Sequence, residues 1–324
     1  MPLNVHVLEM TDDPAWAVLR SRLDGEVRVT TGPDVPPGID ILVAGRPKRE
    51  HLAACPNLRA VVIPWAGVPD STRELMAGFP HVSVHNLHHN ASATAETAIA
   101  LLMAAAKFVV PIDRRLRAND WTPRYEEPAR SILLDGKTAL VLGYGEIGRR
   151  VGRACHALGM KVLAVRRHPV TRLDDVAEIH APGHVRQLLP RADALIVTLP
   201  LTPETRGLIG APELALLPRG SIVVNVGRGP IVDEAALYEA LKSEHLAAAG
   251  IDVWYAYPTD ETSRTNTAPS KYPFDELEHV VMSPHRGGGA REIEPLRMAH
   301  LAEVLNTAAR GDPMPNRVDA QAGY

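Results

Sequence analysis

The sequence predicts an α/β fold with two domains, in which one doubly wound parallel sheet is inserted into a smaller α/β domain. Three observations predict this class. The chain has 324 residues, 45% of them hydrophobic, which is more than one ordinary domain core needs. Short apolar runs alternate with helical stretches along most of the chain. One helix-forming segment without glycine or proline interrupts the alternation, which then restarts.

The smaller domain begins with four apolar runs of strand length, Val5–Leu8, Ile41–Val43, Ala60–Ile63 and Val82–Val84. Helical patterns and Pro/Gly turns separate them, which is typical of a small parallel α/β domain, expected here to be flavodoxin-like. The alanine-rich segment Ser92–Lys107 follows. Its composition predicts a helix long enough to cross from one domain to the other.

The inserted domain begins after a turn at Leu133–Lys137. Six runs beyond it predict buried parallel strands: Thr138–Leu142, Lys161–Val165, Ala194–Leu199, Ser221–Val226, Ala248–Val253 and Val280–Ser283. The last apolar helix, Glu292–Ala309, is expected to return and pack on the first domain. We therefore expect residues 1–100 and 289–324 to form the smaller domain, which binds substrate, and residues 101–288 to form the inserted one.

Composition limits the classes of partner. Lys and Arg number 35 against 38 Asp and Glu, a formal charge of −3, so no charge excess favours nucleic acid or an acidic membrane. The cysteines, Cys55 and Cys155, have neither disulfide-framework nor zinc-site spacing. Neither a leader pattern nor a membrane span is predicted. We expect a cytoplasmic protein that acts on a small molecule.

A dinucleotide site is predicted where Thr138–Leu142 runs into Gly143-Tyr144-Gly145-Glu146-Ile147-Gly148. Gly143 allows the tight turn, Gly145 lets a pyrophosphate approach the backbone, and Gly148 allows close packing of helix and strand. The helix that follows supplies N–H groups to the phosphates. A strand before this motif and a helix after it indicate a Rossmann-type domain.

The next strand ends at Arg166 and Arg167, where an NAD-binding fold usually places a carboxylate for the ribose 2′-hydroxyl. Arginine would instead attract a 2′-phosphate, so the sequence favours NADP, with NAD still possible. The alternative is that both arginines are solvated loop residues.

Two further side chains lie at predicted strand ends, where such sheets bind ligands. Arg228 follows the strand at Ser221–Val226, and His285 follows the strand at Val280–Ser283. Reduction of a carbonyl by hydride needs a proton donor at the oxygen and a cation for a neighbouring carboxylate. Histidine and arginine meet these two needs.

At this point the chain resembles the D-isomer-specific 2-hydroxyacid dehydrogenases, a family that includes glyoxylate/hydroxypyruvate reductases and phosphoglycerate, formate and phosphite dehydrogenases. The resemblance covers nearly the whole chain. Five motifs carry it: Gly143 to Gly148, Leu199-Pro200-Leu-Thr-Pro-Glu-Thr205-Arg-Gly-Leu, Asn225-Val226-Gly227-Arg228-Gly-Pro-Ile-Val-Asp233-Glu, Asp252-Val-Trp, and Ser283-Pro-His285.

The resemblance implies a role for each motif. Arg228 would hold the substrate carboxylate and His285 would deliver the proton, in the cleft between the domains. Asp252 would lie near the nicotinamide carboxamide, and the backbone of the Trp65-Ala66-Gly67 loop would bind the carboxylate. The residues implied to line the cofactor are the glycine-rich motif, Arg166, Arg167, Leu199, Pro200, Thr205, Val226, Gly227, Arg228, Asp252 and His285.

One position departs from the family pattern. Tyr257 precedes Pro258 where the family usually has a glutamate that pairs with the catalytic histidine. A neutral phenol cannot raise the histidine's pKa by charge, so His285 should hold its proton less tightly. We favour the hypothesis that Tyr257 donates a hydrogen bond to His285 and fixes its tautomer. The competing hypothesis is that Glu261 or Glu276 supplies the missing carboxylate.

A histidine-rich stretch, His81, His85, His88 and His89, precedes the crossing helix. These side chains could bind metal, line the substrate pocket or be ordinary loop histidines, and the strand-like Val82–Val84 argues against metal. We therefore expect no metal.

The predicted activity is NADPH-dependent reduction of a small 2-oxo acid such as glyoxylate or hydroxypyruvate, by a homodimer. Two alternatives stay open: a nucleotide-sensing or corepressor-type protein on the same fold, and a formate- or phosphite-type dehydrogenase.

Overall fold

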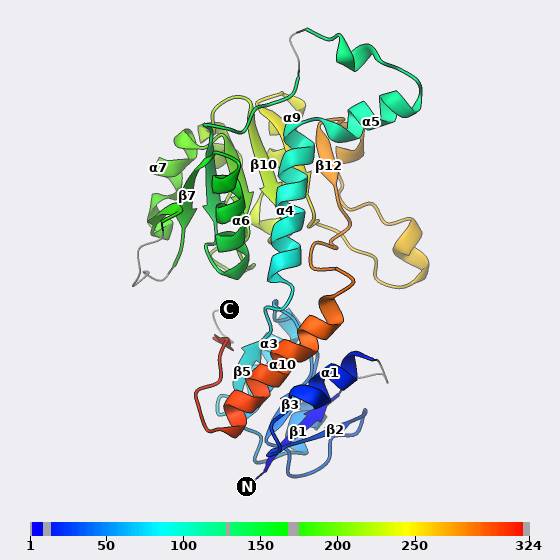
Figure 1. Cartoon of the computed structure of the whole chain (residues 1–324), viewed down its shortest axis with the longest axis vertical. Coiled ribbons are helices and arrows are strands. Elements are labelled where there is room, and N and C mark those ends of the chain that lie inside the picture. Colours follow the sequence, from blue (N-terminus) through cyan, green and yellow to red (C-terminus); the bar gives the residue numbers. More distant parts are fainter. Residues whose placement is uncertain (1, 9–13, 128–129, 168–174, 320–324) are drawn as a thin grey trace. The chain divides into compact units, whose positions relative to one another are not determined.

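The computed structural model describes residues 2–8, 14–127, 130–167 and 175–319, which form two compact units (Figure 1). Unit 1 comprises Met1–Asn90 and Gly289–Tyr324, and unit 2 comprises Ala91–Gly288. Both are built from a mainly parallel sheet covered by helices, which confirms the α/β class. The expected boundary at residues 100 and 101 falls inside a helix, Ala91–Ala106, that belongs to unit 2 as a whole.

Unit 1 contains a six-stranded sheet in the order β13-β5-β4-β3-β1-β2. Strands β1 to β5 are parallel, and β13 is antiparallel to β5. The order of the five parallel strands is that of flavodoxin-like folds, as predicted. The elements of unit 1 are β1 (Leu3–Val7), α1 (Ala15–Arg22), β2 (Val27–Thr31), β3 (Ile41–Val43), α2 (Arg49–Ala53), β4 (Ala60–Ile63), α3 (Asp70–Met76), β5 (Ser83–Asn86), α10 (Ile293–Ala309) and β13 (Arg317–Val318).

Helices cover both faces of the unit 1 sheet. On one face α1 and α10 lie side by side (Figure 1), and Leu19 and Leu305 belong to the same buried apolar cluster as Val5 of β1. The helix α10 returns to this domain because its buried residues recur at helical spacing on one side. Apolar side chains of α2 and α3 pack on the other face. The sequence analysis missed β2, because its polar residues make an edge strand with little apolar signal.

Unit 2 contains a parallel seven-stranded sheet in the order β12-β11-β10-β9-β6-β7-β8. The chain reverses direction across the sheet between the neighbours β6 and β9, which is the topological switch point of a Rossmann-type fold. Its principal elements are α4 (Ala91–Ala106), α5 (Val109–Arg117), β6 (Thr138–Leu142), α6 (Glu146–Ala157), β7 (Lys161–Val165), β8 (Ala177–His180), α7 (Val185–Leu188), β9 (Ala194–Val197), α8 (Ala211–Leu216), β10 (Ser221–Asn225), α9 (Glu234–Lys242), β11 (Leu246–Ile251) and β12 (Val280–Met282).

The six predicted strands are all present, and β8 is a seventh. Its sequence, Ala-Glu-Ile-His, lacks a continuous apolar run because it forms the sheet edge. One face of the sheet is covered by α4 and α6, which lie in front of it in Figure 1. Residues of α7, α8 and α9 pack on the other face.

The helix α5 differs from the other long helices in that none of its residues is buried. Among the helices of the described residues, none alone has the length and apolar character to cross a membrane. The pair α4 and α5 passes that test together, by length and composition only, with a bend of 65° between them. Nine of the 16 residues of α4 are buried, as expected for a core helix.

Candidate active site

The glycine-rich turn lies at the switch point between β6 and α6. Gly143 has a φ of +97°, and a Cβ there would lie 3.0 Å from the backbone of Thr198 and Leu199. A Cβ on Gly148 would lie 2.0 Å from the Gly143 carbonyl oxygen. These two positions therefore require glycine for packing within the protein.

Gly145 has a different reason to be glycine. It is the N-cap of α6 and has no side-chain cap, and nothing lies within 4 Å of the place where its Cβ would be. The space beside Gly145 is therefore open at the end of α6 that carries free N–H groups, which leaves room for a phosphate. The residues present fit a dinucleotide pyrophosphate.

The other residues of the motif differ in what they can offer. The Tyr144 side chain is buried and packs against Gly152, so only its backbone could face a cofactor. The Glu146 side chain forms ion pairs with Arg149 and Arg150 on α6. The Ile147 side chain packs against the apolar cluster beneath α4 and α6.

Arg166 and Arg167 follow β7 at the same edge of the sheet. The Arg166 N–H donates to the His180 carbonyl of β8, which fixes the start of this loop. The Arg167 side chain is exposed. A hydrogen bond from Thr202 has the largest effect in lowering the pKa of Glu204, and the charge of Arg167 lowers it further. No acidic residue occupies positions 166 and 167, so the charge that β7 presents at its end is positive.

The loops that follow β9 and β10 meet beside the glycine-rich turn. Leu199-Pro200 follows β9, and a Cβ on Gly227 would lie 2.6 Å from the Leu199 carbonyl oxygen. Thr205 folds this loop back by donating to the Pro200 carbonyl at 2.7 Å. Val226 donates its N–H to Val197, so β10 and β9 end together. The predicted cofactor-lining residues of these loops therefore lie around the carboxyl edge of the unit 2 sheet.

Arg228 is held by its own loop. Its Nη1 donates to the Gly227 carbonyl at 2.7 Å. Asn225 fixes the backbone on both sides, accepting from the Gly227 N–H at 3.0 Å and donating to the Arg228 carbonyl at 3.1 Å. Burial lowers the pKa of the Arg228 guanidinium, which remains a cation at neutral pH. The sequence analysis did not include Asn225 among the site residues, since its role depends on this turn.

The backbone of His285 adopts a left-handed conformation, with φ of +54°. Such a conformation is uncommon for a non-glycine residue and needs support from its surroundings. Asp252 gives this support, because its buried carboxylate accepts from the Arg286 N–H at 3.0 Å and the Gly287 N–H at 2.9 Å. It also accepts from the Ser283 hydroxyl. Asp252 thus holds the loop on both sides of His285.

Electrostatics set the proton affinity of His285. Partial burial has the largest effect and lowers its pKa, and the positive charge of Arg228 lowers it further. The carboxylate of Asp252 opposes these effects. Neither of the glutamates proposed as a replacement partner contributes to this pKa shift. Glu261 pairs with Arg264 and is 82% exposed, and Glu276 is exposed after the short helical turn Phe274–Glu276.

Tyr257 is the aromatic partner of His285. The two rings lie 5.4 Å apart between centroids at an interplanar angle of 56°. The Tyr257 hydroxyl accepts from the Trp254 N–H at 3.0 Å, and no hydrogen bond joins it to the imidazole in the described residues. The hypothesis that Tyr257 donates to His285 therefore stays a prediction, for which the ring contact supplies the proximity.

The Trp65-Ala66-Gly67 loop follows β4 in unit 1. The Trp65 and Ala66 carbonyl groups accept from the Leu87 N–H at 3.4 Å and from Asn86 Nδ2 at 2.6 Å. In a trans peptide the N–H points opposite to the C=O, so the N–H groups of Ala66 and Gly67 face away from β5. Within the described residues neither N–H has a protein acceptor. Both are thus available to an anionic ligand.

Comparison with models of known protein families identifies the family of this chain. The model of the D-isomer specific 2-hydroxyacid dehydrogenase, NAD binding domain, matches residues 99–287. The chain belongs to this family.

Relatives extend the similarity of this family member beyond the NAD binding domain. A D-3-phosphoglycerate dehydrogenase of Mycobacterium leprae is 34% identical over 307 residues, which cover 92% of this chain and 56% of that protein. The chain thus spans about half the length of the phosphoglycerate dehydrogenases it matches. A glyoxylate reductase of Aeropyrum pernix is 37% identical over 235 residues, covering 71% of this chain and 67% of that protein.

Solved structures of the family have the same fold. A D-isomer specific 2-hydroxyacid dehydrogenase from Xanthobacter autotrophicus Py2, in complex with NADPH and MES, aligns with a TM-score of 0.80. It is 26% identical, and the alignment covers 100% of each chain. The predicted family and the two-domain α/β fold are confirmed.

The histidine-rich stretch of this family member separates into structural and unassigned residues. His85 is buried in β5, and its two ring nitrogens bond to the Pro315 carbonyl at 2.7 Å and to Ser83 Oγ at 3.0 Å. His81 is exposed and packs near Phe79. His88 and His89 lie near Arg297 and His300, whose charges act on His89. Where the structure describes the chain, no group of three or more His, Cys, Asp or Glu side chains could hold a metal ion.

Proposed function

We propose that the protein is an NADPH-preferring reductase of small 2-oxo acids, and that His285 and Arg228 carry its catalysis. The observation that carries the proposal is that both side chains lie within electrostatic reach of each other at the edge where the glycine-rich turn opens. A cation and a titratable proton donor in this arrangement suit a carbonyl that neighbours a carboxylate.

In the proposed mechanism each residue has one task. Arg228 binds the substrate carboxylate and polarises the adjacent carbonyl, and the N–H groups of Ala66 and Gly67 bind carboxylate oxygens. The glycine-rich turn would hold a nicotinamide dinucleotide, which would supply the hydride for C2. His285, in its protonated form, gives its proton to the carbonyl oxygen, so the products are a neutral imidazole and a 2-hydroxy acid. The reverse reaction begins from neutral His285.

The lowered pKa of His285 affects the two directions differently. Reduction needs the protonated ring, and burial and Arg228 leave that form less populated at neutral pH. Asp252 and the ring of Tyr257 then position the imidazole, and among the described residues no glutamate contributes to its pKa. We therefore expect reduction to be fastest below neutral pH.

Steady-state oxidation of NADPH and NADH with glyoxylate, hydroxypyruvate and larger 2-oxo acids tests the activity. Turnover that is lost in Arg228→Gln and in His285→Gln, with the fold intact, is the expected result. Nucleotide binding without turnover of any acid would contradict it and favour a nucleotide sensor instead.

Preference for NADPH is proposed from Arg166 and Arg167, and the complex of the Xanthobacter autotrophicus relative with NADPH supports it. Each charge-assisted bond to a 2′-phosphate contributes about 1.5–3 kcal/mol. The double variant Arg166→Ser/Arg167→Ser should therefore raise KM for NADPH by about 10-fold or more and leave KM for NADH nearly unchanged. Arg153→Ser, which removes an exposed arginine of α6, is the matched control. An equal effect on both cofactors would exclude a 2′-phosphate site.

We also propose that the protein is a homodimer and that α5 contributes to the contact. Val109, Ile112 and Leu116 recur on one side of α5 and are 38–49% exposed. Trp121 and Tyr125, which follow α5, are also exposed. Such a group of apolar side chains is typical of an interface. Leu116→Asp should shift the protein toward the monomer in analytical ultracentrifugation, whereas a monomeric wild type would exclude the dimer.

A further inference from the structure

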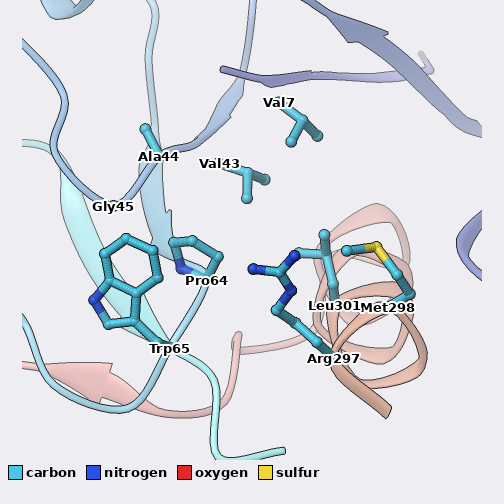
Figure 2. Close-up of a pocket in the computed structure, with 9 residues that line it drawn as sticks. All are labelled: Val7, Val43, Ala44, Gly45, Pro64, Trp65, Arg297, Met298 and Leu301. Atoms are coloured by element: carbon cyan, nitrogen blue, oxygen red, sulfur yellow. The ribbon is translucent and has the colours of Figure 1, made fainter. Parts of the chain in front are cut away.

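A small pocket in unit 1 lies at the carboxyl edge of its sheet (Figure 2). It is formed where β3 and β4 end and where α10 begins. Its volume of about 40 Å³ gives room for roughly three water molecules. Except for one arginine the lining is apolar or backbone: Val7, Val43, Ala44, Gly45, Pro64, Trp65, Arg297, Met298 and Leu301.

Arg297 is the one charged residue in this lining. Figure 2 shows its guanidinium reaching from α10 into the pocket, toward Pro64. Its Nη2 pairs with Glu294 one turn earlier on the helix. Its Nε is buried and has no hydrogen-bond partner in the part of the chain that the structure describes. Buried donors are nearly always paired in native proteins, so this arginine lacks an acceptor that a ligand could supply.

Trp65 connects the pocket to the carboxylate-binding loop. Its indole packs on Gly45, where a Cβ would lie 1.9 Å from the ring, and the Arg46 guanidinium stacks 5.8 Å from the ring centroid. The ring is therefore fixed by its neighbours. The next two residues, Ala66 and Gly67, offer the free N–H groups described above. A ligand whose carboxylate binds this loop has the pocket beside it.

The surrounding charges indicate which acceptor fits. Burial, followed by the charges of Arg297, His300 and His88, lowers the pKa of His89 to about 4, so His89 is neutral at pH 7. Glu294 already neutralises Arg297 in part. A second carboxylate would have to compete with Glu294, whereas a hydroxyl or carbonyl oxygen would add an acceptor without adding charge.

We propose that this pocket binds an oxygen-bearing side chain of the substrate, and that Arg297 selects 2-oxo acids with a hydroxyl group on C3. This inference rests on the proposed function and names its substrate class. The ligand oxygen accepts from the unused donors of Arg297, and the apolar lining encloses the C3 carbon. Glyoxylate, which has no C3, leaves the pocket empty, so its reduction does not depend on Arg297.

Three acids that differ only in the group attached to the C2 carbonyl test the proposal: hydroxypyruvate, pyruvate and glyoxylate. Arg297→Met keeps the apolar stem and removes the donors. We expect kcat/KM for hydroxypyruvate to fall by about 10- to 100-fold, as for loss of a hydrogen bond from a charged group. The values for pyruvate and glyoxylate should stay within about threefold. Arg310→Met, at the far end of α10 where Arg310 pairs with Asp24, is the matched control and should change none of them.

The outcomes separate this inference from the proposed function. If Arg297→Met lowers all three acids equally, or changes none, the selection by Arg297 is wrong although the reductase stands. If the wild type reduces no acid, the proposed function fails. The pocket is then tested by thermal unfolding with D-glycerate and D-lactate, which differ by one hydroxyl group. Greater stabilisation by D-glycerate that disappears in Arg297→Met supports the pocket, and equal or absent stabilisation excludes it.

Discussion

Replacement of Tyr257 by glutamate should restore a charged partner to His285 and raise its pKa. The ring centroids of Tyr257 and His285 lie 5.4 Å apart, so a carboxylate near that place would stabilise the imidazolium by about 3 kcal/mol at an effective dielectric constant of 20. Tyr257 is 44% exposed, and solvent screening reduces this to about 1.5–2.5 kcal/mol, or one to two pKa units.

The assay is the pH dependence of kcat/KM for reduction of a 2-oxo acid. Because reduction needs protonated His285, the rate falls as pH rises through its pKa. In Tyr257→Glu this falling limb should move to higher pH by one to two units, and reduction at pH 7 should become faster. Tyr257→Gln, which is neutral and of similar length, should leave the limb near its wild-type position.

Two results would refute this reasoning. If the limb stays in place in Tyr257→Glu, the group that titrates is not His285 or the carboxylate does not reach it. If Tyr257→Gln shifts the limb as far as Tyr257→Glu does, the effect arises from solvation and not from charge. Tyr257→Phe adds a separate test, because unchanged rate and pKa would exclude a role for the hydroxyl group.

Three further predictions concern the site and the fold. Gly145→Ala should keep the melting temperature and weaken NADPH binding, whereas Gly148→Ala should lower the melting temperature, because only the Cβ added at Gly148 meets protein atoms. Differential scanning fluorimetry and nucleotide titration measure these effects. Equal effects of the two variants in both assays would argue against an open phosphate site. Asp252→Asn should lower the free energy of unfolding, measured by urea titration, by about 2–4 kcal/mol, because an amide leaves at least one backbone N–H of the His285 loop unpaired. Turnover should also fall, and Ser283→Ala is the milder control. An unaffected kcat would show that Asp252 does not position His285. His89 has a pKa of about 4 in the folded protein and stays neutral at pH values where the unfolded chain is protonated. Its contribution to the free energy of unfolding should therefore be fully present above pH 6.5 and be lost as the pH falls to 4. The loss, discounted for partial exposure, is about 1–2 kcal/mol, and His89→Gln should not show this loss.

Much of the fold was accessible from sequence because buried parallel strands are continuous apolar runs. Val141 and Ile196 illustrate this, since both lie in central strands with no exposed surface. The edge strands β2 and β8 were not predicted, because half-polar sequences such as Val-Arg-Val-Thr-Thr become strands only when a neighbour pairs with them. Tertiary pairing, which a single-sequence pattern does not contain, decides these elements.

The residues of the candidate site were likewise recognised only in part from the sequence. Gly145, Arg228 and His285 stand at strand ends, so topology alone brings them to one edge. Asn225 and Arg297 were missed because their significance is geometric. Asn225 matters through two bonds across its own turn, and Arg297 through a pocket formed by residues far away in the sequence. The hydrophobic pattern of α10 indicates only which face of the helix is apolar.

The insertion of unit 2 into unit 1 has a consequence for the order in which the chain acquires its structure. Residues 1–90 emerge from the ribosome with one face of their sheet lacking α10, the helix that later packs there beside α1. About 200 residues of unit 2 are made before α10 appears, which takes roughly 10–40 seconds at ordinary synthesis rates. During that interval Val5, Val43 and Val62 have no α10 to cover them. The inserted domain is thus complete before the domain that surrounds it.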